Sequence, residues 1–463
     1  MSCCFGKRLL TGIHGRRGQK SSERISAFFW CHLLLYESPT HRGASSPQVG
    51  LLDRLPQVKR KELLPVILGG DAGAYALALE FYEAFNVKSI FVSNAPAEII
   101  TRSSLASVEH IPAGINDEEL LAVLQGIAAL HTDSQLVLLA NTDARASFAA
   151  AFREQLEPDY VVPFPSQDAM NKLCRKDSFA QVCSEHGALT PPTVVVDLSG
   201  SDVPEIPFGF PVVAKAASGD EYDRLTLEGK KKIWFIDTPE ELSSLWQRLR
   251  TAGFQGKFLV QETIPGPDSQ MVSLTLYVDS HGTATMLAGA RVLLEDHSPT
   301  MVGNPVAMIT RKFPDLWEQA QAILAAANYR GFANFDLKID PRDGKVYFFE
   351  VNPRIGRNSY YVAAAGVNPM QVMVEDLVDG EQLNVQIASH EVLYSLVPMS
   401  LIRRYVDDAE LVAVAKRLAD DGKMVSPLEA PHEKNMRRKI VVALQKMNYH
   451  RKFAAYFPRS SDA

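Results

Sequence analysis

The sequence predicts a mixed α/β protein with more than one domain, and three observations support this prediction. Short apolar strands alternate with helical segments through residues 61–165, which is the pattern of a doubly wound parallel sheet. A β-hairpin with a polar face is expected at residues 331–357, and amphipathic helical patterns return in residues 381–463. A chain of 463 residues is long enough for two to four domains and a sizeable core.

The composition is that of an ordinary globular protein, with 46% hydrophobic and 22% charged residues. The net charge of -6 argues against a nucleic-acid-binding protein, and we find no stretch that is long and apolar enough to be an integral membrane segment. Of the five cysteines, Cys3, Cys4 and Cys31 lie near the N-terminus, whereas Cys174 and Cys183 are expected within one helix. This spacing fits neither a disulfide framework nor a zinc site, so we expect a reducing, cytoplasmic location.

Residues 1–60 differ in composition from the remainder of the chain. The first fifty hold seven Lys or Arg against two acidic residues, and the apolar run Ile25–Tyr36 is too short to span a membrane. Three interpretations compete: a disordered tail, a signal-like segment without a clear cleavage site, or a start of translation placed too early, although the next methionine is Met170. We expect a tail or a misplaced start and assign no function to this segment.

Residues 61–165 predict a βαβ-type domain. The expected strands are 64–68, 87–92 and 136–140, and the expected helices are 75–85, 117–131 and 144–155. A glycine-rich turn, Gly69–Gly73, follows the first strand at the place where α/β sheets often bind ligands. A tight connection that needs glycine explains this turn equally well. The turn lacks the G-x-G-x-x-G spacing, so a dinucleotide oxidoreductase is not supported.

The hairpin at residues 331–357 predicts a metal site. Its two alternating runs flank an Asp343-Gly344 turn, which brings Asp336 opposite Glu350 and leaves Asn352 on the same face. Two carboxylates that lie close together repel each other unless a cation lies between them, and ligands that are all oxygen suit Mg²⁺. Arg354 is placed to hold a phosphate or a carboxylate. An exposed hairpin with solvated charges is the alternative, but the whole arrangement favours the metal.

Two lysines are candidate phosphate ligands. Lys176 belongs to a basic helical stretch expected over residues 166–190, and Lys215 ends an apolar strand at residues 211–215. A lysine at the end of a buried strand needs an anionic partner, and a nucleotide phosphate is one. A solvated basic face for the first lysine and a side chain that reaches solvent for the second are the alternatives.

These features occur in the order that is found in the ATP-grasp ligases, and the chain resembles this family. The resemblance lies in K176-D-S-F, the strand that ends at Lys215, the Q261-E-T-I stretch and the D336…E350-V-N-P-R hairpin. The resemblance implies that ATP and Mg²⁺, with Mn²⁺ as an alternative ion, are the cofactors. The implied ATP-binding residues are Lys176, Lys215, Gln261, Glu262, Ile264 and Asp268, the last at the ribose. The implied metal ligands are Asp336, Glu350 and Asn352, and the implied catalytic arginines are Arg291 and Arg354. Residues 218–223, where the family has a glycine-rich lid loop, are poorer in glycine than the common pattern.

The resemblance also implies the domain organisation. The ATP-grasp fold would follow an N-terminal Rossmann-like domain with a parallel sheet, and a small helical C-terminal piece would end the chain. The expected boundaries are 1–60 for the tail, 61–165 for the Rossmann-like domain, 166–380 for the ATP-grasp domain (lid about 190–265, metal-site part about 266–380) and 381–463 for the C-terminal region.

Within the superfamily the chain is similar to bacterial carboxylate–amine ligases of the D-aspartate ligase type, from LGGDAGAYALA to NYHRKFAAYF. The resemblance implies that a carboxylate, the β-carboxylate of D-aspartate, is activated as an acyl phosphate. It is then coupled to a lysine side chain of a nucleotide-linked peptidoglycan precursor. One alternative is an ATP-grasp ligase for other amino acids or amines, and another is a non-catalytic ATP-binding protein. Whether the protein forms a homo-oligomer is left open by the sequence.

The last helical pattern, residues 433–457, is basic and aromatic. It predicts either a packed cap with a solvated basic face or a helix at a membrane surface. We favour the packed cap, because basic amphipathic helices of this kind more often pack on their own fold than bind a membrane.

Overall fold

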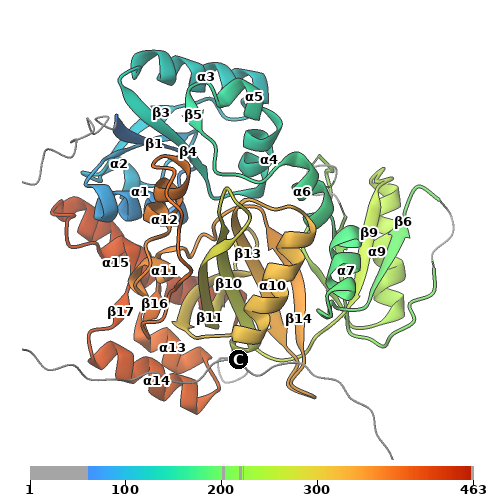
Figure 1. Ribbon diagram of the computed structural model, residues 1–463. Coiled ribbons are helices and arrows are strands. Elements are labelled where there is room, and N and C mark those ends of the chain that lie inside the picture. Colours follow the sequence, from blue (N-terminus) through green and yellow to red (C-terminus); the bar gives the residue numbers. More distant parts are fainter. Residues whose placement is uncertain (1–60, 201–203, 218–221, 223, 460–463) are drawn as a thin grey trace, which may run out of the picture. The chain divides into compact units, whose positions relative to one another are not determined.

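The computed structural model describes residues 61–200, 204–217, 222 and 224–459, without the side chains of Lys176 and Asp177. The expected N-terminal tail and most of the expected lid loop therefore lie outside the described residues. The described part contains three β-sheets with helices beside them (Figure 1). It confirms the predicted mixed α/β fold with a parallel sheet.

The first sheet is parallel and has five strands in the order β3-β2-β1-β4-β5. Its strands are β1 Glu62–Leu68, β2 Ser89–Ser93, β3 Ala106–His110, β4 Ser134–Ala140 and β5 Tyr160–Val161. Its helices are α1 Ala72–Phe85, α2 Glu98–Thr101, α3 Asp117–Leu130, α4 Asp143–Ala151 and α5 Arg153–Leu156.

Both faces of this sheet are covered. Ile67 of β1 packs in one core with Leu77 of α1, whereas the neighbouring Val66 packs in another core with Leu120 and Leu124 of α3. The strand order reverses between β1 and β4, and the carboxyl ends of the strands at such a point commonly bind ligands.

The glycine turn after β1 serves close packing. Asp71 caps α1 by accepting a hydrogen bond from the backbone nitrogen of Ala74 at 2.9 Å. A Cβ atom at Gly73 would lie 2.9 Å from the Cα and the Cβ of Arg357. Glycine therefore lets the start of α1 approach Arg357, at the end of the expected hairpin segment.

The expected helical stretch 166–190 is two helices, α6 Gln167–Leu173 and α7 Lys176–Glu185. Arg175, between them, has an extended backbone. The hydroxyl of Ser178 donates to the carbonyls of Asn171 (3.2 Å) and Arg175 (3.1 Å), and the first is a carbonyl that a continuous helix would use itself. The expectation that Cys174 and Cys183 share one helix was therefore wrong, because Cys174 caps the end of α6 and Cys183 lies in α7.

The second sheet is antiparallel and has four strands in the order β6-β9-β7-β8. The strands are β6 Thr193–Asp197, β7 Val212–Ala216, β8 Trp234–Ile236 and β9 Lys257–Glu262, and the helix α9 is Pro239–Thr251. Leu242 and Trp246 of α9 are buried in one core with Val212 and Ala214 of β7. Val213, which lies between these two in β7, and Lys215, which follows them, point to the other face.

The third sheet has eight strands, seven of them in the order β14-β13-β10-β11-β12-β16-β17. The strands are β10 Met271–Val278, β11 Ala284–Asp296, β12 Asn304–Thr310, β13 Gly331–Ile339, β14 Val346–Asn352, β15 Gln386–Ile387, β16 Leu393–Ser395 and β17 Met424–Val425. The helices in this part of the chain are η1 Asp268–Gln270, α10 Pro314–Ala326, α11 Tyr360–Ala364 and α12 Pro369–Leu377.

The helix α10 covers one face of this sheet. Its residues Trp317 and Ile323 are buried in one core with Leu274 of β10 and Phe335 of β13. Because side chains alternate along a strand, the polar residues of β13 face the other side, away from α10.

The C-terminal segment joins the third sheet and also contacts the first. It contains α13 Met399–Tyr405, α14 Ala409–Asp420, η2 Pro427–Glu429 and α15 Met436–Tyr456, in addition to β15, β16 and β17. The long helix α15 contacts α2 and η2.

An ion pair buried between the C-terminal segment and the first sheet's helices fixes this contact. Glu433 and Arg438 are each 1% exposed and lie 3.6 Å apart. Glu433 accepts hydrogen bonds from the hydroxyls of Tyr75 (2.9 Å) and Ser103, and Arg438 donates to the carbonyls of Ile99 and Leu428, both at 2.9 Å. The guanidinium of Arg438 also lies 4.4 Å from the ring centre of Tyr75.

A buried carboxyl in α1 predicts how stability depends on pH. Burial raises the pKa of Glu80 to about 8, although the hydroxyl of Ser359 donates to it at 2.8 Å. An unfolded Glu ionises near pH 4.5, so the folded state holds an extra proton between these values and loses stability as the pH rises. We expect Glu80→Gln to remove about 2 kcal/mol of the fall in unfolding free energy between pH 6 and pH 8.5.

Chemical denaturation at the two pH values measures this effect, with the exposed Glu118→Gln in α3 as the matched control. A variant whose stability still falls with pH as steeply as that of the original chain would show that Glu80 does not carry the proton.

Candidate active site

The hairpin of β13 and β14 holds the candidate metal ligands. Asp336 pairs with Glu350 and Asn334 pairs with Asn352, so the four side chains lie on one face. The amide of Asn352 donates to Asp336 Oδ2 at 3.0 Å, and the amide of Asn334 donates to Asp336 Oδ1 at 3.3 Å. A bulge follows directly, because Leu337 pairs with Phe348 and Phe349 is passed over.

The electrostatics of this pair fit a cation. Burial and the nearby Glu350 raise the pKa of Asp336 to about 7, against the opposing effects of Arg354 and of the hydrogen bond from Asn352. Two half-buried carboxylates that repel each other, together with an amide oxygen, form a donor set that suits a hard ion such as Mg²⁺. Among the described residues no group of three or more His, Cys, Asp and Glu side chains is placed to hold a metal, so an amide and substrate oxygens would have to complete the shell.

A third carboxyl lies beside this pair. Burial, Asp268 and Asp336 raise the pKa of Glu295 in β11 to about 8, whereas Lys338 opposes the rise. Lys338 is two residues after Asp336 on β13, and burial lowers its pKa. Glu295 of β11, Asp268 of η1 and Lys338 of β13 therefore extend the polar face from the hairpin toward β11.

The structure places Asp268, the expected ribose ligand, at the start of η1. Its Oδ2 accepts hydrogen bonds from the backbone nitrogen of Glu295 at 2.9 Å and from His297 Nε2 at 2.8 Å. The ring of His297 stacks on Phe457, with centroids 3.9 Å apart. Asp268 is thus fixed by β11 and, through His297, by the end of the chain.

The two expected catalytic arginines are held differently. Arg354 Nε lies 2.9 Å from Asp143 Oδ1, and its Nη2 donates to Asn352 Oδ1 at 3.4 Å. Arg291 of β11 donates from Nε to the carbonyl of Ser269 and from Nη2 to Gln270 Oε1 at 2.8 Å. Arg354 therefore belongs to the metal hairpin, whereas Arg291 braces the segment that contains η1.

A second arginine joins the hairpin to the first sheet. Arg357 Nε lies 3.4 Å from Asp71 Oδ2 at the start of α1, in addition to the pair of Arg354 with Asp143 at the start of α4. The carboxyl ends of β1 and β4, at the reversal of strand order, therefore lie against the metal hairpin.

The expected ATP-binding residues of the lid lie on the second sheet. Lys215 pairs with Leu259, and Gln261 pairs with Val213, so Lys215 and Gln261 share the face opposite α9. Glu262 ends β9 and lies 3.3 Å from Arg342 Nη2 in the turn of the metal hairpin, and the following Ile264 is buried. Lys176 is the first residue of α7, a helix that contacts β14, and its side chain is outside the described part.

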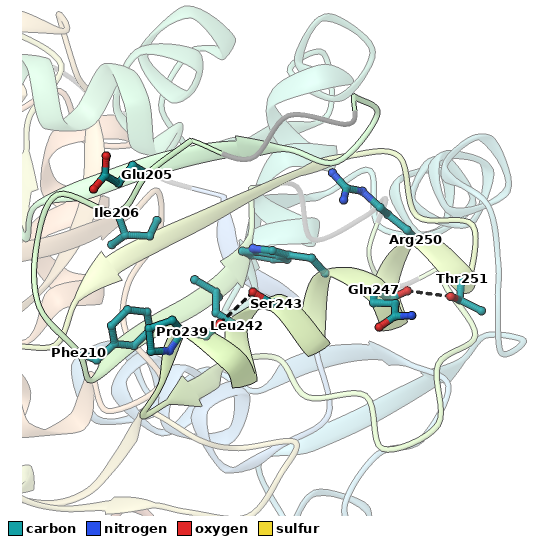
Figure 2. Close-up of a pocket in the computed structure, with 10 residues that line it drawn as sticks. Glu205, Ile206, Phe210, Pro239, Leu242, Ser243, Gln247, Arg250 and Thr251 are labelled. Atoms are coloured by element: carbon teal, nitrogen blue, oxygen red, sulfur yellow. Dashed lines mark hydrogen bonds between the residues drawn. The ribbon is translucent and has the colours of Figure 1, made fainter.

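A cavity of about 570 Å³ lies elsewhere on the second sheet. Figure 2 shows Leu242, Ser243 and Gln247 of α9 on one side of it and Glu205, Ile206 and Phe210, which precede β7, on the other. The cavity is on the face that α9 covers, opposite to Lys215, and no predicted site residue lines it. We therefore do not assign it to the nucleotide.

The structure brings together Asp336, Glu350, Asn352 and Arg354, and it connects Asp268 to them through Glu295. Sequence reasoning missed Asn334, Glu295, His297 and Lys338. Alternation along β13 gave a usable signal for Asn334 and Lys338, which share the face of Asp336. Glu295 and His297 had no such signal, because their place in the site depends on how β11 pairs with strands from distant parts of the chain.

We expect Lys215→Gln to raise the KM for ATP by about tenfold or more, because the strand-end ammonium would lose its contact with a phosphate. Steady-state kinetics of ADP release measure this change. Lys232→Gln, an exposed lysine that lies after the lid loop, is the matched control. An unchanged KM in the Lys215 variant would remove this residue from the site.

Comparison with known proteins identifies the domain. The family described as "Carbamoyl-phosphate synthase L chain, ATP binding domain" matches residues 196–385. D-aspartate ligase of Enterococcus faecium is 29% identical over 414 residues, which cover 86% of this chain and 98% of that protein. The arginine-specific carbamoyl phosphate synthase large chain of Lactiplantibacillus plantarum is 26% identical over 184 residues, 38% of this chain and 17% of that protein.

Solved structures agree on the fold. The ADP complex of the N5-carboxyaminoimidazole ribonucleotide synthetase PurK is 14% identical with a TM-score of 0.53, over 86% of this chain and 98% of that chain. The N5-carboxyaminoimidazole synthetase of Staphylococcus aureus is 15% identical with a TM-score of 0.52, over 73% and 82% of the two chains. At these identities the likeness concerns the fold alone, and the domain match with the long similarity to a ligase carries the assignment. The chain contains an ATP-grasp domain and is an ADP-forming, ATP-dependent carboxylate–amine ligase that is similar to D-aspartate ligase over most of its length.

Proposed function

We propose that the chain joins the β-carboxylate of D-aspartate to the side-chain amine of a lysine in a nucleotide-linked peptidoglycan precursor, in the cytoplasm. The observation that carries this proposal is the similarity to D-aspartate ligase, which extends over 98% of that protein. If the similarity were confined to the ATP-binding domain, it would support a ligase but not a particular substrate.

The chain's own residues have defined tasks in this proposal. Asp336, Glu350 and Asn352 would hold Mg²⁺, which would neutralise charge on the phosphates of ATP. Lys176 and Lys215 bind phosphate oxygens, and Gln261, Glu262 and Ile264 form the adenine site, with Asp268 at the ribose. The pairs of Asp268 with His297 and of Glu262 with Arg342 hold these groups in position before the nucleotide arrives.

The reaction proceeds in two displacements. A carboxylate oxygen of the acid attacks the γ-phosphorus, the bond between that phosphorus and the bridging oxygen breaks, and ADP leaves. The amine then attacks the acyl carbon, inorganic phosphate leaves with the former carboxylate oxygen, and the nitrogen loses a proton to form the amide. Arg354, on the metal hairpin, stabilises the negative charge that is transferred, and we assign Arg291 a supporting role because two of its nitrogens already donate to the chain.

ADP release with Mg²⁺-ATP and a panel of amino acids, each with and without amine acceptors, tests this proposal. We expect release that requires both D-aspartate and an acceptor with a lysine side chain. L-aspartate serves as the control for stereochemistry, and an acceptor peptide whose lysine amine is acetylated serves as the control for the nucleophile. ADP release with a different acid or amine would be consistent with ligase activity but would refute the proposed substrates.

A further inference from the structure

The C-terminal helix α15 has two apolar faces, and only one of them is used by the fold. Arg438, Val442 and Phe453 are buried against the rest of the chain. On the opposite side Met436, Ile440, Leu444 and Met447 are exposed, by 57% to 67% of their surface.

The exposed residues form one continuous stripe. Positions three and four apart lie above one another on a helix, and these four residues follow at intervals of four, four and three. In the described part of the chain eleven large apolar side chains are exposed, and five of them, including Tyr456, belong to α15. Single exposed apolar residues are ordinary, whereas an aligned group marks an interaction surface.

The charges beside the stripe are all positive. Residues 436–456 contain six Lys or Arg and no Asp or Glu, although the whole chain has a net charge of -6. Arg438 is buried, and Lys446 and Lys452 form ion pairs with Glu429 and Asp296. The exposed Arg437, Lys439 and Arg451 border the apolar stripe.

Charge decides among the candidate partners. Two copies of α15 packed through their stripes would bring only positive charges together, which costs free energy in either orientation. Residues 1–50 are also basic, with seven Lys or Arg against two acidic residues, so their charge does not complement this helix. An anionic lipid surface complements both the stripe and its borders.

We propose that α15 docks the ligase on anionic membranes, with the stripe of Met436, Ile440, Leu444 and Met447 lying in the lipid interface. The helix would lie in the plane of the membrane, and no helix of the described residues is long and apolar enough to cross one. The buried pair of Glu433 and Arg438 at its start fixes the helix on the fold, so the stripe is presented in a single orientation.

Vesicle flotation with the full chain tests this proposal. The vesicles are phosphatidylcholine alone, or equal parts of phosphatidylcholine and phosphatidylglycerol. We expect binding to the anionic vesicles only, and weaker binding at high salt because surface charges are screened. The double variant Ile440→Gln/Leu444→Gln and the triple variant Arg437→Gln/Lys439→Gln/Arg451→Gln should each lose about tenfold or more in partitioning.

Matched controls separate the stripe from general surface changes. Leu130→Gln/Val385→Gln replaces exposed apolar residues elsewhere, and Lys88→Gln/Lys312→Gln removes exposed charges elsewhere, so both should bind like the original chain. Far-ultraviolet circular dichroism shows whether the α15 variants keep their helix content, and ADP release without vesicles should be unchanged in them. Binding to neither vesicle, or full binding by the stripe variants, would overturn the proposal. A dimer in sedimentation that Ile440→Gln/Leu444→Gln dissociates would overturn it in favour of a second copy.

Discussion

Replacing Asp336 with asparagine is expected to slow ADP release by about 10²- to 10³-fold while the protein stays folded. The carboxylate is the charged centre of the candidate metal site, and an amide supplies only a neutral oxygen. Stability should change little, because two effects oppose each other. The variant loses a charge that Glu350 repels, and in either amide orientation it loses one of the two hydrogen bonds from Asn334 and Asn352, which is worth about 1 kcal/mol.

Kinetics and thermal unfolding measured on the same sample distinguish the two roles of Asp336. Asp343→Asn, in the exposed turn of the same hairpin, is the matched control and should keep its activity. An Asp336→Asn protein that releases ADP at the original rate would refute the metal assignment. Loss of activity together with a strong loss of stability would indicate a structural role instead.

Removing one partner of the buried ion pair is expected to give the largest loss of stability. Arg438→Ala leaves Glu433 as a buried charge, and breaking such a pair typically costs about 3–5 kcal/mol. The loss should appear in the free energy of unfolding, measured by chemical denaturation at pH 7. Arg437→Ala, the exposed neighbour in α15, should change that free energy by less than about 0.5 kcal/mol.

The double variant Glu433→Ala/Arg438→Ala separates the charge from the packing. Once both charges are removed no uncompensated ion stays buried, so the double variant should be less unstable than the sum of the single variants predicts. Additive losses would mean that the two residues act through separate contacts. Because the pair joins α15 to the helices of the first sheet, the same variants should also expose the C-terminal segment to proteolysis.

Local chemistry in the sequence determined the core of the candidate site. The Asp343-Gly344 turn and the alternation on both sides of it fix the register of the hairpin, and the structure pairs Asp336 with Glu350 as the sequence predicts. The doubly wound sheet was predictable for the same reason, because helix and strand periods are properties of short segments. The break between α6 and α7 was missed because a single hydroxyl, that of Ser178, takes over a helix carbonyl.

Only the tertiary structure decided which distant groups join the site. Glu295 and His297 come to Asp268 through η1 and β11, and their local sequence carries no motif. The same holds for the contact of Arg357 with Asp71 and for the burial of Arg438, which looks like any other residue of a basic helix in the sequence. Periodicity states which face of an element is apolar, but the pairing of strands and the docking of helices decide which face is covered. The sequence therefore determined the chemistry of the hairpin, whereas the fold decided its neighbours and left one apolar stripe of α15 exposed.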